Sequence, residues 1–143
     1  DLGLLGNLVD QDMSVRDPKA ARDAFLAFKE LVTRFPDSKY AADSTSRMKY
    51  LVNALASNEV HVAKYYLKRE AWVAAANRAK EVLKTYPEAP ALEEALAIMV
   101  IAYDKLKLTD LRDDAQRVLT LNFPNSKYAK GVNTEGKAWY RFW

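Results

Sequence analysis

The chain contains an internal repeat, and this repeat limits the possible folds more than any other feature. Residues 35–41 read Phe-Pro-Asp-Ser-Lys-Tyr-Ala, and residues 123–129 repeat that phrase with Asn in place of Asp. A looser copy, Tyr-Pro-Glu-Ala-Pro-Ala-Leu, occupies residues 86–92. An aromatic–proline pair ends an amphipathic helix, and the short polar turn after it begins the next one. The repeat therefore predicts a helical solenoid, a class of protein that usually binds partners.

Composition agrees with an all-α fold. Hydrophobic residues make up 50% of the 143 residues and charged residues 29%, which suffices for a buried core in one domain. Only 4 glycines and 5 prolines are present, so few turns of the kind that sheets need are possible. Cysteine is absent, which excludes disulfides and thiolate chemistry.

The charge balance does not require a nucleic-acid partner, and we expect none. The net charge is +3, from 22 basic and 19 acidic residues. The middle of the chain, residues 61–84, is nevertheless basic, with six cations against Glu70 and Glu81. This local excess favours an acidic surface on a protein partner.

Apolar residues at helical spacing predict five helices, over residues 18–34, 39–69, 71–85, 91–107 and 110–121. The first begins with Asp-Pro, a capping residue followed by proline at the first helical position.

The second helix is unusually long because the repeat spacing is uneven. Pro36 and Pro87 are 51 residues apart, whereas Pro87 and Pro124 are 37 apart, a difference of 14. Fourteen residues are roughly four helical turns, so a helix lengthened by this amount keeps its apolar face in register. The alternative is a break at Ser57-Asn58, two residues that are good helix caps.

We expect residues 1–143 to form a single C-terminal portion of a helical-repeat domain. Its parts are an incoming loop (1–17), a helix (18–34), a long-helix hairpin (39–85), a second hairpin (91–121), and a C-terminal cap and tail (122–143). In this arrangement helix 18–34 has lost its partner, which predicts an upstream portion of the solenoid. The tail carries four aromatic residues within 139–143, which favours a cap over the last hairpin; a peptide that binds a partner or a bilayer interface is the alternative.

No constellation of residues supports catalysis, a metal site or a cofactor site. His61 is the single histidine and no cysteine is present, whereas zinc needs three or four ligands. We expect His61 to be an ordinary helix residue. The carboxylate pairs at 93–94 and 113–114 are adjacent in sequence, so we expect solvated side chains that point apart.

The helix pairs with an aromatic–proline exit resemble tetratricopeptide repeats, which have small, aromatic, small and proline residues where this chain has Ala63, Tyr66, Ala75 and Pro87. Three phrases together resemble the BamD family, lipoproteins of the bacterial outer-membrane β-barrel assembly machine (BAM). They are Arg-Asp-Pro with Ala-Arg and Ala-Phe (16–25), Val-Ala with Tyr-Tyr and Arg (62–69), and Ala-Trp-Val-Ala with Asn-Arg (71–78). The resemblance covers residues 5–130, the C-terminal portion of such a protein.

The resemblance implies a non-enzymatic scaffold at the periplasmic face of the outer membrane. Its implied partners are the membrane-proximal POTRA domain of BamA, accessory BAM lipoproteins and unfolded outer-membrane proteins. Contact with the membrane would occur only through an N-terminal lipid anchor outside this chain. The alternative is a periplasmic coordinator of the Tol-Pal-associated type, which uses similar Phe-Pro phrases in more regular repeats.

The family places Arg78 at the contact with BamA, and helical spacing puts Ala74 and Glu81 on the same flank. From the residues alone, a pair between Arg78 and Glu81 within the helix is the alternative. Near the turn at residues 69–70, Tyr65 and Arg69 complete the predicted partner-binding set.

We expect Tyr65 to be exposed, whereas Tyr66 and Trp72 are predicted to lie in the core because large rings supply most of the buried area in a small solenoid.

Overall fold

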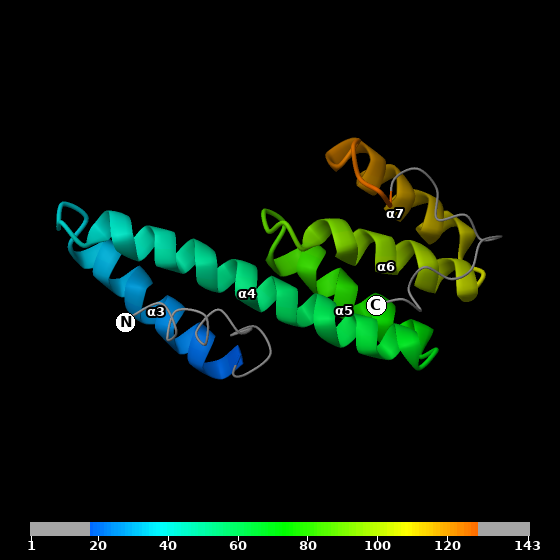
Figure 1. Cartoon of the computed structure of the whole chain (residues 1–143), viewed down its shortest axis with the longest axis horizontal. Coiled ribbons are helices and arrows are strands. Elements are labelled where there is room, and N and C mark those ends of the chain that lie inside the picture. The colour runs from blue at the N-terminus through cyan, green and yellow to red at the C-terminus, as the bar shows by residue number, and fades with distance from the viewer. Residues whose placement is uncertain (1–17, 129–143) are drawn as a thin grey trace, which may run out of the picture. The chain divides into compact units, whose positions relative to one another are not determined.

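The computed structural model describes residues 18–128, and all regular elements in that range are α-helices (Figure 1). They are α3 (Pro18–Arg34), α4 (Ala41–Lys68), α5 (Trp72–Thr85), α6 (Leu92–Lys105) and α7 (Thr109–Asn122). The all-α prediction is confirmed. The incoming loop at 1–17 and most of the tail after residue 128 lie outside the described residues, and the single-domain assignment stays a prediction.

The long helix is continuous. Helix α4 contains 28 residues, and Ser57 and Asn58 lie inside it, so the alternative of a break at this position is wrong. At about 1.5 Å per residue the helix is about 42 Å long, twice the length of the 14-residue α5. No proline or glycine interrupts the sequence here, and the apolar stripe continues through the added turns.

The three copies of the repeat form the same turn. In each copy the aromatic N–H donates to the carbonyl four residues earlier at 2.9 Å, and the residue three positions later donates back to the aromatic carbonyl at 2.9–3.0 Å. In the first and third copies a serine hydroxyl also accepts the N–H of the tyrosine two residues on, at 3.2 Å for Ser38 and 3.0 Å for Ser126. The repeat in the sequence is therefore a repeat of backbone hydrogen bonds.

The other two helix connections form a second kind of turn. Glu70 and Lys107 both have φ of 60°, the left-handed conformation that ends many helices. The residue after each donates its N–H to a carbonyl five positions earlier, from Ala71 to Tyr66 at 3.0 Å and from Leu108 to Tyr103 at 2.9 Å. Glycine is the usual residue at this position, because a Cβ atom disfavours positive φ.

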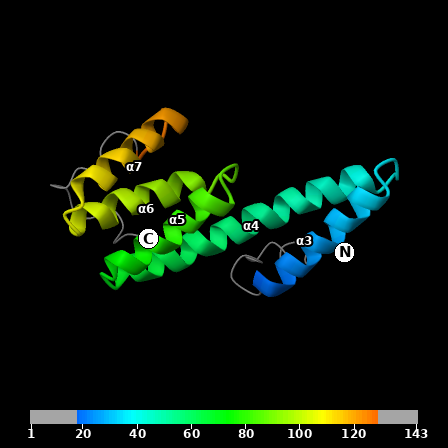
Figure 2. The same cartoon turned by 180° about the vertical axis from the view of Figure 1, so that it is seen from behind.

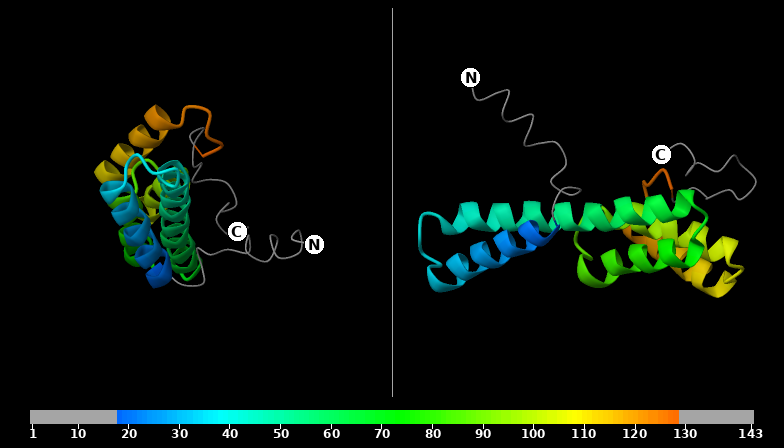
Figure 3. Two further views of the ribbon diagram at one scale, coloured as in Figure 1. Left: turned by 90° about the vertical axis from the view of Figure 1, so that its left-hand side faces the viewer. Right: turned by 90° about the horizontal axis from the view of Figure 1, so that it is seen from below.

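Contacts divide the chain into two compact units, Asp1–Asn58 and Glu59–Trp143. In the first unit, α3 runs antiparallel beside the N-terminal part of α4 (Figures 1 and 3). The extra turns of α4 supply a surface for α3, and the upstream portion of the solenoid stays a prediction. Within α3 only Ala21 is fully buried, and the rest of its apolar face is half-buried.

In the second unit, α6 packs against both α5 and α7 (Figure 2). Helix α6 is covered on almost every side, with Leu92 and all nine residues from Ala95 to Tyr103 buried. A helix that is apolar all round needs such cover. Despite this composition, none of the helices within residues 18–128 combines the length and apolar character needed to cross a membrane.

Candidate partner-binding surface

Arg78 lies on the outer side of α5. Four small residues, Ala75, Ala76, Ala79 and Val82, form the buried face of this helix, and Arg78 lies at the edge of that face. The guanidinium Nη1 of Arg78 donates to the Glu59 carboxylate Oε2 at 3.1 Å, which ties α5 to α4. The Arg78 side chain is 46% exposed and that of Glu59 is 18% exposed. Arg78 is therefore anchored at one end and open to solvent at the other.

The predicted alternative, a pair between Arg78 and Glu81, is not the pair that forms. Glu81 is exposed and instead accepts a hydrogen bond from the Thr85 hydroxyl at 3.4 Å. The spacing of residues along α5 could predict only partners of Arg78 on the same helix, such as Glu81. The partner that the structure supplies, Glu59, lies 19 positions earlier and reaches Arg78 through the packing of α4 with α5.

Ala74 is half-buried one turn before Arg78, and Glu81 lies about one turn after it. The three predicted residues of α5 thus share one side of the helix, as their spacing indicated. This edge of α5 combines one anchored cation, one exposed carboxylate and the small side chain of Ala74.

Tyr65 and Arg69 form a second part of the predicted set, near the end of α4. Tyr65 is 51% exposed, and the Arg69 guanidinium carbon lies 4.8 Å from the centre of its ring. Tyr66 contacts the same ring edge-on, with centroids 5.7 Å apart. The predicted exposure of Tyr65 is confirmed. Glu59, which holds Arg78, lies ten residues before Arg69, and ten residues span about 15 Å along a helix. The contact at Arg78 and the contact at Tyr65 and Arg69 are therefore separate.

The prediction that Tyr66 and Trp72 lie in the core is wrong, because both residues are only half-buried. The ammonium of Lys105 lies 5.8 Å from the centre of the Trp72 ring. Trp72 begins α5 beside the turn at Glu70, where the helices end and less protein surrounds the ring. Alanines and branched aliphatic residues, rather than these aromatics, fill the centre of this unit.

A set of ion pairs between helices also could not be predicted from the spacing of residues along the sequence. Lys64 on α4 pairs with Glu94 on α6, and the side chains are 24% and 34% exposed. Arg112 on α7 reaches Asp104 on α6 at 2.8 Å. Glu94 is therefore not the solvated residue that its position in an acidic pair suggested. Residues far apart in sequence form these pairs, so no motif in the sequence could identify them.

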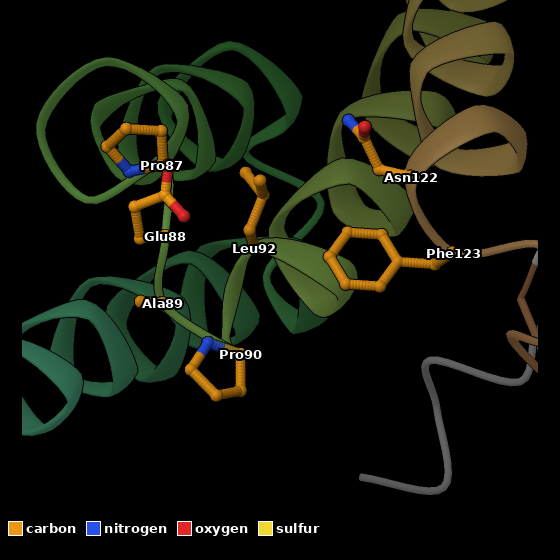
Figure 4. A pocket seen from close by; sticks show the side chains of 7 residues that line it. All are labelled: Pro87, Glu88, Ala89, Pro90, Leu92, Asn122 and Phe123. Atoms are coloured by element: carbon orange, nitrogen blue, oxygen red, sulfur yellow. The ribbon is translucent and has the colours of Figure 1, made fainter.

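A small open pocket lies between the second and third copies of the repeat turn (Figure 4). Its volume is about 480 Å³. Pro87, Glu88 and Pro90 line one side, and Leu92 and the Phe123 ring line the other. None of the predicted partner-binding residues lines this pocket, although both turns carry the repeat phrase.

Comparison with known proteins identifies the family. Residues 2–119 match the family model YfiO, described as an outer membrane lipoprotein. The chain is 50% identical over 144 residues to "outer membrane protein assembly factor BamD" of Neisseria gonorrhoeae, covering all of this chain and 54% of that protein. Proteins of the same name from Haemophilus influenzae and Vibrio cholerae are 44% and 41% identical, covering 78% and 85% of this chain and 42% and 51% of theirs.

This chain thus spans about half the length of the curated relatives it matches. Their names fit the interpretation as an outer-membrane assembly protein and not the Tol-Pal-associated alternative. The match to the family model covers most of the chain, from the segment before α3 to the last turns of α7. The chain therefore belongs to the YfiO family of outer membrane lipoproteins.

Proposed function

We propose that this chain is the C-terminal portion of a non-enzymatic scaffold subunit of the outer-membrane protein assembly complex. Its relatives are named outer membrane protein assembly factor BamD, which supports this role. The function would be to hold partner proteins in a fixed arrangement while β-barrel proteins enter the outer membrane. In the complete protein an N-terminal lipid anchor would keep the scaffold at the periplasmic face of that membrane.

The proposed partner of this portion is the membrane-proximal POTRA domain of BamA. The observation that carries the proposal is the half-exposed Arg78, which Glu59 on α4 holds in place. Ala74 and Glu81 would complete this contact, and Tyr65 with Arg69 would form a second one. Accessory lipoproteins and unfolded outer-membrane proteins are further proposed partners of the complete protein.

The test is Arg78→Glu, measured by titration calorimetry with the purified POTRA domain. Reversing a charge that faces a carboxylate removes an ion pair and adds repulsion, so affinity should fall at least about tenfold. The same substitution also places two carboxylates together, Glu59 and the new one, so the fold loses some stability. Thermal unfolding must therefore show that the variant is folded at the titration temperature.

Lys80→Glu is the matched control, because Lys80 is an exposed cation on the same helix, about 160° around the helix axis from Arg78. It makes the same change in net charge and should change affinity by less than about threefold, as expected for a charge outside the contact. Equal losses in both variants would indicate a general charge effect. Unchanged affinity in Arg78→Glu would show that this side of α5 is not the docking surface.

A further inference from the structure

Glu59 differs from the acidic residues that form ion pairs within α3 and near the start of α4. The pairs Lys19–Asp23, Glu30–Arg34 and Asp43–Arg47 each lie within one helix, with both side chains at least 60% exposed. Glu59 is on a different helix from Arg78 and is only 18% exposed. A carboxylate so far removed from water is stabilised by a charged donor, and Arg78 supplies it.

The geometry leaves much of the Arg78 guanidinium available. An arginine carries five N–H donors in a rigid plane, and the Nη1 group donates to Glu59. The side chain is 46% exposed, so donors on its outer edge remain within reach of a second carboxylate. A lysine ammonium could not serve two carboxylates in this way, because it is a compact point charge without the planar fork.

In the same unit, Arg112 is an arginine that binds two carboxylates at once. Its Nη1 contacts Asp104 on the neighbouring helix at 2.8 Å, and its Nη2 contacts Asp113 at 3.0 Å. The Asp104 side chain is 23% exposed and that of Asp113 is 60% exposed. Arg112 thus joins one sheltered and one exposed carboxylate. Among the described contacts, Arg78 has only the sheltered carboxylate.

We propose that Glu59 is a positioning residue, which holds Arg78 in the orientation that receives an aspartate or glutamate side chain of the docking protein. This inference rests on the proposed function, since it takes the α5 surface as the contact. A free arginine loses rotamer freedom when a partner fixes it, and this loss weakens binding by about two- to tenfold. Glu59 fixes the side chain before the partner arrives, so the complex avoids most of that loss.

The decisive variant is Glu59→Gln, which keeps the shape of the side chain and removes its charge. Simple electrostatics predicts that loss of a negative charge strengthens binding to an acidic partner. The positioning role predicts the opposite, a loss of about two- to tenfold in affinity for the POTRA domain. Glu88→Gln is the control, since it removes an exposed carboxylate that belongs neither to the proposed contact nor to the Arg78 pair.

A second measurement follows Arg78 in the full chain without any partner. Nitrogen-15 relaxation of its side-chain Nε–Hε group reports motion on the picosecond-to-nanosecond timescale. Its order parameter should be high in the native protein and in Glu88→Gln, and clearly lower in Glu59→Gln. Thermal midpoints of all variants show whether the fold itself has changed.

The outcomes separate the two proposals. If Arg78→Glu weakens docking but Glu59→Gln leaves affinity unchanged or raises it, the positioning role is overturned and the docking surface stands. An unchanged Nε–Hε order parameter in Glu59→Gln overturns the positioning role on its own. If neither Arg78→Glu nor Glu59→Gln changes affinity, the docking surface is wrong and the positioning role fails with it.

Discussion

The two compact units of this chain bury their helices to very different extents. In the first unit, the described residues include six that are buried, Ala21, Ala41, Ser44, Leu51, Leu55 and Ala56. In the second, α6 alone buries ten. Among the described residues of its unit, the amphipathic α3 lies beside α4 alone, whereas α6, which is apolar all round, packs against both α5 and α7. One neighbouring helix leaves the apolar face of α3 half-buried, and two neighbours bury almost all of α6.

The ion pairs show the same contrast. The three pairs described in the first unit connect residues four apart on one helix. In the second unit, pairs link α4 to α5, α4 to α6 and α6 to α7, with partly sheltered side chains. Pairs within an exposed helix contribute little to stability, whereas sheltered pairs between helices fix how those helices pack. The packing of the helices is therefore more firmly fixed in the second unit than in the first.

The largest expected effect compares one leucine from each unit. Leu96→Ala removes a fully buried side chain from α6 and should lower the free energy of unfolding by about 3 to 5 kcal/mol. Leu31→Ala truncates a half-buried residue of α3 and should lower it by about 1 to 2 kcal/mol, since less contact is lost. Urea denaturation followed by circular dichroism measures both. Equal losses would mean that α3 is as well covered as α6.

An intermediate effect compares two lysines. Lys64→Met leaves the half-sheltered Glu94 without its ion-pair partner on α4 and should reduce stability by about 1 to 2 kcal/mol. Lys19→Met removes an exposed pair within α3, and about 0.2 to 0.5 kcal/mol should be lost. Repeating the denaturation in 1 M salt sharpens the test, because screening should abolish the smaller effect first. A larger loss for Lys19→Met would contradict the contrast between the units.

The smallest expected effect is a gain in the second unit. Lys107 has a φ of 60°, so Lys107→Gly relieves backbone strain and should stabilise the α6–α7 connection by about 0.5 to 1 kcal/mol. Lys105→Gly is the control, because it places glycine at the last helical position of α6 and should destabilise by a similar amount. Amide exchange should slow in α6 and α7 for the first variant, without a change in α3. Slower exchange in α3 as well would show that the units do not unfold separately.

Much of this fold could be predicted from local features. The bounds of α3 agree with the prediction, and those of the other helices differ by at most two residues at either end. Proline, the apolar stripe and the repeat phrase act within a few residues, so their effects are visible in the sequence. The same reasoning placed Ala74, Arg78 and Glu81 on one side of α5, because a helix has a fixed period.

The two complete copies of the repeat phrase separate what the sequence determined from what the tertiary structure decided. Both make the same backbone hydrogen bonds, because those bonds join residues within a few positions of one another. Yet Phe35 and Tyr40 are 62% and 57% exposed, whereas Phe123 is half-buried and Tyr128 is 7% exposed. Identical local sequence cannot decide burial, because burial depends on which distant segments pack against the turn. For the same reason only the packing of α4 with α5 could give Arg78 its partner Glu59.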